Sequence, residues 1–171
     1  MRRTRLREFQ AQLADRMQAA RDSTETRAHH LGVMMGDTHC LLDLQEASEI
    51  IAVGAITAVP LTQDWYLGLS NIRGKLFSVI DIARFQGQAP TAITADCRII
   101  AFAPALSFNS ALLVSRVLGL RNVAEMTPEA SGNTERAAWT AQRYCDAESR
   151  VWTQLKLSLM VQDPRFLHVG L

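Results

Sequence analysis

The 171-residue sequence carries 18 Lys and Arg against 17 Asp and Glu, which gives a formal net charge of +1, and 48% of its residues are hydrophobic. This near balance of charge gives no general electrostatic reason to bind nucleic acid or an anionic membrane surface. The length accommodates one ordinary hydrophobic core, or two small cores that share an interface, but excludes a second enzymatic domain.

The first twenty residues carry apolar side chains at spacings of three and four, which predicts an amphipathic helix from about Arg3 to Ala20. A polar run, 22–26, follows it and predicts a linker. We therefore expect residues 1–28 to form a helical extension and linker, and residues 29–171 to form one domain. Docking of the helix on that domain is favoured over a role as a partner-binding helix. The apolar stripe consists of Leu6, Phe9, Leu13, Met17 and Ala20.

From His30 onward the sequence consists of short apolar runs separated by turn residues, a pattern typical of an all-β barrel or sandwich. Residues 31–35 and 39–44 flank Gly36-Asp37, which predicts the first hairpin. Residues 45–53 fit either a short helical turn or an irregular strand. Residues 55–61 are expected to form a strand at an edge or end of a sheet, because Pro60 cannot donate to a central ladder.

The stretch from Gly68 to Gly87, GLSNIRGKLFSVIDIARFQG, contains two apolar runs on either side of a polar turn. It predicts strands at 70–73 and 76–83, with the turn at Gly74-Lys75. Both faces of the second strand carry aliphatic residues, so we expect this strand to be packed between two elements. A charged residue at such a turn points outward, and the stretch therefore presents Arg73 to a partner.

The remaining elements are also mainly strands. Residues 98–103 and 111–117 predict two more, residues 130–136 a surface excursion, and residues 139–145 with 150–157 a closing hairpin. A short C-terminal helix is expected next, with Ser158 as its cap. Pro164 is expected to end that helix, and the apolar tail after it to pack against the domain.

Tests for catalytic motifs do not support an enzyme, and no catalytic residue is assigned. A phosphate-binding loop needs four residues between its glycines and a Ser or Thr after its Lys, whereas Gly68 and Gly74 enclose five and Leu76 follows Lys75. The Gly-x-Ser-x-Gly pattern of a nucleophile elbow is absent. Nothing in the sequence places the pairs of acidic residues across a cleft, as general acid–base catalysis would need. The aromatic residues are not interleaved with lysines, since Lys75 and Lys156 are the only two, so a nucleic-acid reader is a weaker alternative.

The cysteines and histidines lack the spacing of a disulfide framework or a metal site, so neither a metal nor another cofactor is expected. His29 and His30 are interpreted as solvated residues of an exposed linker. Polar residues interrupt the most hydrophobic region, and the arginine-rich N-terminus has no apolar segment typical of a signal peptide. We therefore expect a soluble chain in a reducing cytosol, without direct membrane insertion and without a cleaved leader.

The Gly68–Gly87 stretch resembles the signature of the CheW family of chemotaxis coupling proteins, which reads Asn-Leu-Arg-Gly, a short strand and a Val/Ile-Asp-Leu close. Asn71, Arg73, Gly74 and Asp81 match this signature, whereas Ser78 replaces the usual proline. The resemblance extends from about His30 to the C-terminus. It implies a mainly β fold of two small SH3-like β-barrels, here with the N-terminal amphipathic helix and a short C-terminal helix.

Weaker features resemble the branch of the family that controls type IV pili and twitching motility. They are the helical N-terminal extension, Trp65 before the signature, Arg73-Gly74-x-Leu76, Phe85-x-Gly87 and the ending Phe166-Leu167-x-Val169. The family role that the resemblance implies is non-catalytic. One surface binds the cytoplasmic tip of a methyl-accepting chemoreceptor and another binds the regulatory domain of a CheA-type histidine kinase, so the chain would associate with membrane-bound receptor arrays through its partners.

Arg73 is the leading candidate for partner binding, because its planar guanidinium suits carboxylates and carbonyls of a partner helix. The alternative is an internal pair with Asp81 or Glu49 that braces the turn. The resemblance places Ala47, Glu49 and Gly68 at receptor contacts, although Ala47 is smaller than the aliphatic residue expected there. Asn71 and Gly74 are expected to shape the turn, and Asp81 to orient Arg73 or to cap the strand end. A small nucleic-acid-binding barrel and an unrecognised hydrolase remain the alternative functions.

Overall fold

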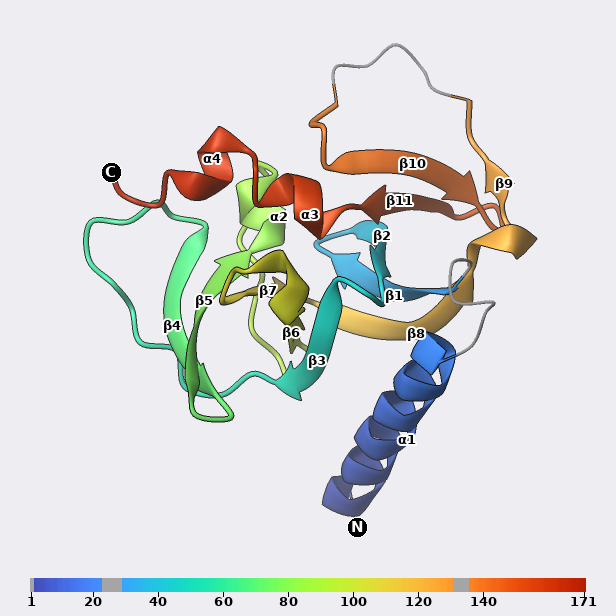
Figure 1. Ribbon diagram of the computed structural model, residues 1–171, viewed down its shortest axis with the longest axis horizontal. Helices are drawn as coiled ribbons and strands as arrows, with labels where there is room; N and C mark the ends of the chain where they lie inside the picture. The colour runs from blue at the N-terminus through green and yellow to red at the C-terminus, as the bar shows by residue number, and fades with distance from the viewer. Residues whose placement is uncertain (1, 23–28, 131–135) are drawn as a thin grey trace.

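The computed structural model describes residues 2–22, 29–130 and 136–171. The expected linker after the first helix and most of the expected excursion at 130–136 lie outside the described residues. The chain folds into two sheets with a few short helices (Figure 1), which confirms the mainly β fold expected from the sequence. Among the described residues, no helix is long and apolar enough to cross a membrane.

The six-stranded sheet is assembled from both ends of the chain in the order β8-β1-β2-β11-β10-β9. Its neighbouring strands are antiparallel except for β2 and β11, which run parallel. The strands are β1 His29–Met35, β2 Thr38–Asp43, β8 Arg116–Asn122, β9 Thr127–Pro128, β10 Thr140–Cys145 and β11 Val151–Leu155.

The five-stranded sheet is continuous in sequence and has the order β3-β6-β7-β5-β4. Its one parallel pair is β5 with β7. The strands are β3 Ala47–Ala52, β4 Tyr66–Ile72, β5 Lys75–Asp81, β6 Arg98–Phe102 and β7 Ser110–Val114.

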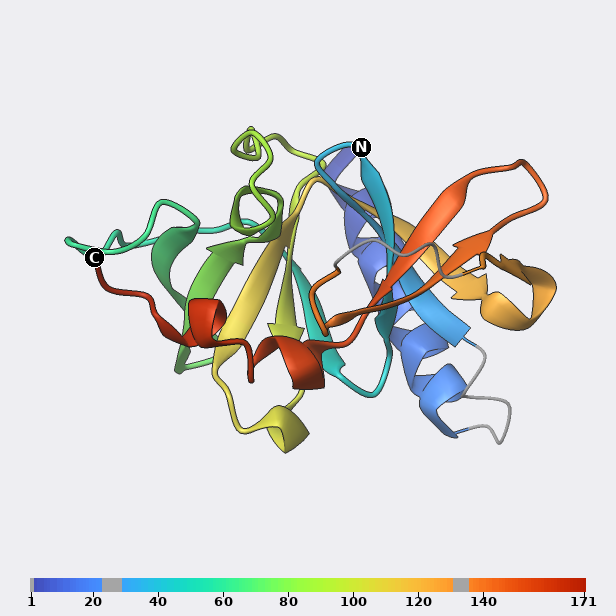
Figure 2. The same ribbon diagram turned by 90° about the horizontal axis from the view of Figure 1, so that it is seen from above.

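The helices lie around and between the sheets, as the two views at right angles show (Figure 2). The long N-terminal helix α1, Arg2–Asp22, contacts β3. The short helices are α2 Ile82–Phe85, η1 Pro104–Leu106, η2 Val123–Glu125, α3 Leu157–Met160 and α4 Pro164–Leu167.

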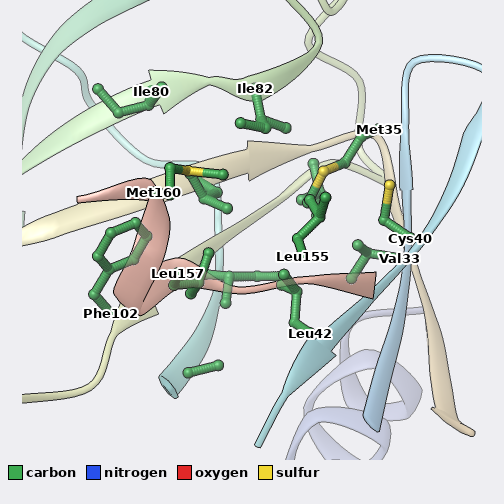
Figure 3. Packing of buried hydrophobic residues seen from close by; sticks show 14 of the residues in the cluster. Val33, Met35, Cys40, Leu42, Ile80, Ile82, Phe102, Leu155, Leu157 and Met160 are labelled. Atoms are coloured by element: carbon green, nitrogen blue, oxygen red, sulfur yellow. The ribbon is translucent and has the colours of Figure 1, made fainter. Parts of the chain in front are cut away.

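The main hydrophobic core lies between the sheets and includes residues of both sheets and of α3 and α4. Figure 3 shows side chains of β1, β2, β5 and β6 converging with Leu157 and Met160 of α3. A second cluster, which includes Phe77, Val79, Ile99 and Leu113, lies on the other face of the five-stranded sheet. Alternate residues of β5 therefore face different clusters, which confirms that this strand is packed between two elements.

The N-terminal helix and the first hairpin form as the sequence predicts. Leu13 and Met17 of α1 are buried in the main core, so the helix docks on its own chain. Gly36 has a φ of +59°, which glycine adopts at less cost than residues with a Cβ, and it opens the turn between β1 and β2. The segment 45–53, for which two conformations were open, forms strand β3.

Several expectations for individual segments are wrong. Residues 55–61 form no strand and make a single β-bridge, Thr57 with Leu69, and Leu61 at φ +59° turns the chain at the end of this segment. His29 and His30 are not in an exposed linker but begin β1, where His30 is buried with its Nε2 2.9 Å from Nε2 of Gln154.

The third error concerns the C-terminal helix. Ser158 lies inside α3 and does not cap it. The carboxylate of Glu46, which lies just before β3, instead accepts hydrogen bonds from the backbone N–H groups of Leu157 at 2.7 Å and Ser158 at 3.2 Å. Pro164 begins the next helix, α4, in which Phe166 is buried but Leu167 is exposed. A carboxylate at a helix N-terminus satisfies otherwise unpaired N–H groups, and here it also ties α3 to the segment before β3.

The chain passes from one sheet to the other at Ser115. The sequence predicts one strand over 111–117, whereas β7 ends at Val114 and β8 begins at Arg116, in the other sheet. The Ser115 N–H donates to the Met34 carbonyl at 2.9 Å, which ties the crossing to β1.

Candidate partner-binding site

The β4–β5 hairpin ends in a two-residue turn at Arg73-Gly74, since Ile72 pairs with Lys75 in the ladder. This turn begins one residue earlier than the sequence predicts. Both central residues have positive φ, +50° for Arg73 and +83° for Gly74, as the tightest hairpin turns require. The Asn71 Oδ1 accepts a hydrogen bond from the Gly74 N–H at 2.9 Å. Asn71 and Gly74 thus shape the turn that carries Arg73.

Arg73 lies at the tip of this hairpin and forms an ion pair with Glu49 of β3. The Arg73 Nε and the Glu49 Oε2 are 3.0 Å apart, and the two side chains are 80% and 30% exposed. Strands β3 and β4 stand at opposite ends of the sheet order. The pair therefore shows that the five-stranded sheet curls until the end of its last hairpin reaches its first strand, as in a small barrel.

The ion pair leaves most of the arginine available. An exposed pair contributes about 0–1 kcal/mol to stability, because water screens the charges and two long side chains must be held in place. A guanidinium carries five N–H donors. Arg73 therefore pairs internally with Glu49, which is one of the two interpretations from the sequence, and still offers donors to a partner.

Three of the other candidate residues are buried and do not present a side chain at the surface. Ala47 has no exposed surface. Gly68 has a φ of +134°, and a Cβ built there would lie 2.1 Å from the Thr57 carbonyl oxygen. The glycine therefore allows the backbone at Thr57 to lie directly against β4. Asp81 is only 2% exposed. Among the candidate residues, Asn71, Arg73 and Gly74 are exposed and Glu49 is partly exposed.

Asp81 caps the structure after β5 and does not orient Arg73. Its Oδ1 accepts from the Arg84 N–H at 3.3 Å and from the Thr91 hydroxyl at 2.8 Å, and its Oδ2 accepts from the Thr91 N–H at 2.7 Å. The aspartate thus begins α2 and holds the loop before β6 against it.

Ser78, which stands where the resembling family has proline, uses its additional N–H within the chain. The group donates to the Asn109 carbonyl at 2.8 Å. The Ser78 hydroxyl lies 2.9 Å from the hydroxyl of Tyr66 on the neighbouring strand. The substitution therefore adds bonds that hold β5 to its surroundings.

A groove of about 280 Å³ lies beside the Arg73–Glu49 pair, between α1 and the sheets. Its lining combines α1 with β3 and includes side chains from β6 and β8. The residues are Gln10, Leu13, Ala14, Met17, Gln18, Ser48, Glu49, Ile50, Ile51, Arg73, Arg98 and Val117. The sequence did not reveal that α1 lines this groove. The apolar stripe predicts that the helix docks, but it does not predict which residues of the sheets the polar side chains of the helix will face.

The titratable and sulfur-containing groups provide little for chemistry. Burial raises the pKa of the Cys40 thiol to about 12, which keeps it protonated and poorly nucleophilic at neutral pH. Within 2–22, 29–130 and 136–171, no group of three or more His, Cys, Asp and Glu side chains is placed to hold a metal ion. The β4–β5 hairpin thus presents an exposed cation beside the groove.

Comparisons with known proteins identify a family. A family model described as "CheW-like domain" matches residues 29–165. The chain is 26% identical over 105 residues to Protein FrzA of Myxococcus xanthus, a match that covers 60% of this chain and 65% of FrzA. The match thus spans slightly less than two thirds of FrzA.

A solved structure has a similar fold. It is the crystal structure of the scaffolding protein TtCheW from Thermoanaerobacter tengcongensis, with a TM-score of 0.64 and 21% sequence identity. The match covers 75% of this chain and 88% of that one. At this identity the likeness concerns the fold.

Proposed function

The chain belongs to the CheW-like domain family, and from this premise we propose that it is a non-catalytic coupling adaptor. It links the cytoplasmic tip of a methyl-accepting chemoreceptor to the regulatory domain of a CheA-type histidine kinase. The adaptor works in the cytoplasm and joins receptor arrays through these partners. Neither contact needs to be large, because two modest contacts on one rigid scaffold reinforce each other through effective concentration.

The observation that carries this proposal is the presentation of Arg73. Its side chain is 80% exposed although the backbone beneath it is fixed by the Asn71 hydrogen bond and the two-residue turn. An exposed side chain on a rigid element loses less conformational freedom on binding than one on a mobile loop. The planar guanidinium then meets carboxylates or backbone carbonyls at the end of a partner helix.

The partner-facing set that we propose is therefore Arg73 with its neighbours Glu49, Asn71 and Gly74. Ala47, Gly68 and Asp81 support this set from inside the fold, since they build β3, the close approach at β4 and the end of β5. We further assign the adaptor to the pilus branch. Trp65, Phe85 and Phe166, which suggest that branch, pack together with ring centroids 5.0–6.3 Å apart.

Calorimetric titration with both proposed partners tests the assignment. Arg73→Ala should weaken binding of the receptor tip or the kinase regulatory domain about tenfold, which corresponds to about 1.4 kcal/mol. The Arg116→Ala variant removes an equal charge from an exposed position on β8 and should bind like the wild type. Kinase domains from a pilus system and a flagellar system, titrated in parallel, identify the branch by the tighter binding.

Unchanged affinities of Arg73→Ala for both partners, together with an unchanged melting curve, would refute the role of this surface. Absence of saturable binding by the wild type to any receptor tip or kinase domain of its host would refute the adaptor itself.

A further inference from the structure

Helix α1 lies beside the candidate surface and contributes to it. Figure 1 shows the helix passing next to β8 and β3. Leu13 and Met17, one turn apart, are buried beneath it. The neighbouring stripe of the same helix, Gln10, Ala14 and Gln18 at i, i+4 and i+8, lines the groove. The helix thus seats itself through Leu13 and Met17, which also border the groove, and Gln10, Ala14 and Gln18 extend its lining.

The opposite wall of the groove is formed by residues of the sheets. Strand β3 supplies Ser48 to Ile51, and the hairpin tip supplies Arg73. Arg98 of β6 is held by hydrogen bonds from its Nη1 to the Ala95 and Cys97 carbonyl oxygens at 2.8 Å and 2.6 Å. The charged lining residues are therefore two arginines and Glu49, so the groove has a net charge of +1.

The size of the groove limits what enters it. A helix with its side chains is about 10–12 Å across, whereas a groove of about 280 Å³ takes one or two side chains. The small Ala14 leaves room between the two glutamines, and their amides donate and accept hydrogen bonds. An acidic side chain that projects from a partner helix matches this combination of positive charge, amides and limited volume.

We propose that α1 forms the second wall of the receptor-binding site, and that the groove between α1 and β3 takes an acidic side chain of the receptor tip. This proposal rests on the proposed function and deepens it. The helix then determines which receptor tips bind, because a tip without an acidic residue at the right position gains nothing from Gln10, Gln18 and Arg98.

A pair of matched variants tests this role. Ala14 and Ala19 are both exposed residues of α1, but only Ala14 lines the groove. Ala14→Trp fills the groove and should weaken binding of the receptor tip at least tenfold. Ala19→Trp should change that affinity less than twofold. Both variants should keep the wild-type affinity for the kinase regulatory domain and the wild-type circular-dichroism melt.

A second variant of the full chain distinguishes two roles of α1: a wall of the binding site, or a segment that occupies the site in place of the receptor. Leu13→Asn with Met17→Asn removes the apolar seat of α1 without adding charge to the groove, and a helix that forms a wall then loses its position, so affinity for the receptor tip should fall. A rise in affinity would mean that α1 occupies the site in place of the partner, and would overturn the proposal. A concentration-dependent dimer that accounts for the Ala14→Trp effect in light scattering would also overturn it, because the groove would then receive a second copy.

The two proposals can fail separately. Equal affinities of Ala14→Trp and Ala19→Trp would refute the role of α1 while a tenfold loss in Arg73→Ala upholds the adaptor. A wild-type chain that binds no receptor tip would refute the proposed function first, and the role of α1 with it.

Discussion

Two hairpin turns of this chain carry an arginine beside a carboxylate, and they use the pair in opposite ways. At the β4–β5 turn, Arg73 meets Glu49 through one contact of 3.0 Å and remains 80% exposed. At the β10–β11 turn, Asp146 is only 10% exposed and accepts hydrogen bonds from Arg150 Nε at 2.9 Å and Trp152 Nε1 at 2.8 Å.

Backbone N–H groups around Asp146 increase the difference between the two turns. Asp146 also accepts from the N–H groups of Glu148 at 3.0 Å and Arg150 at 2.9 Å. A carboxylate with four donors braces its turn, and its arginine also pairs with Glu148. The comparison teaches that an arginine–carboxylate pair identifies neither a brace nor a binding site. The number of donors around the carboxylate and the exposure of the arginine distinguish the two.

The largest effect is expected from removal of the residue beneath the braced turn. Trp152 has no exposed surface, stacks under Arg121 at 5.1 Å and contacts His39 edge-on. Trp152→Ala should lower the free energy of unfolding by about 3–5 kcal/mol in urea titrations, because it leaves a cavity and removes a donor from Asp146. Trp152→Phe, which keeps a ring, should cost less. A loss below about 1 kcal/mol for Trp152→Ala would show that this turn is not the rigid one.

An acid titration should sharpen the comparison. Desolvation raises the pKa of Asp146, but the hydrogen bonds from Trp152 and Arg150 and the charge of Arg150 lower it by more, so the pKa lies well below its usual range. A depressed pKa in the folded state contributes stability that is fully present above the unfolded pKa of about 3.9. That stability is lost as the pH falls from there toward the folded pKa.

The measurement is the free energy of unfolding of the wild type and Asp146→Asn as a function of pH. The stability gap between them should be constant from neutral pH down to about pH 5 and should shrink below about pH 4. Arg73→Ala, which leaves the surroundings of Asp146 intact, should follow the wild-type profile. A gap that stays the same down to pH 2 would contradict the assigned role of the Asp146 carboxylate.

The smallest effect is expected at the exposed pair. A double-mutant cycle with Arg73→Ala and Glu49→Ala should give a coupling energy below about 1 kcal/mol in unfolding experiments, because water screens the charge of Arg73, whose side chain is 80% exposed. High salt should reduce it further. A coupling energy of several kcal/mol would make this pair a brace like that of Asp146 and would remove the distinction between the turns.

Features that depend on neighbouring residues in the chain, such as the hairpin turns and the alternation along β5, could be predicted from the sequence. Gly36 and Gly74 lie at turns that need positive φ, and Asn71 accepts a hydrogen bond across its turn, so the two hairpins and the outward position of Arg73 could be predicted. The alternation of apolar residues along β5 revealed a strand covered on both faces. These features depend on neighbours within a few residues.

Features that depend on distant contacts could not be predicted in this way. The change of sheet falls at Ser115-Arg116, and a polar pair inside an otherwise apolar run is equally compatible with a solvent-facing position in one continuous strand. The burial of Asp81 is compensated by donors from Thr91, and the cap of α3 comes from Glu46. Likewise, the place of Gln10 and Ala14 beside Arg73 depends on where α1 docks, which the helical stripe alone does not specify.

The pairing of β2 with β11 has a consequence for the order in which the protein folds during synthesis. The two strands lie side by side and in parallel, yet the whole five-stranded sheet lies between them in the chain. On the ribosome that sheet emerges complete while the first hairpin still lacks β11. Pairings between distant segments form slowly because a long loop must close. The barrel that carries Arg73 is therefore expected to form first and to serve as the template on which the other sheet closes.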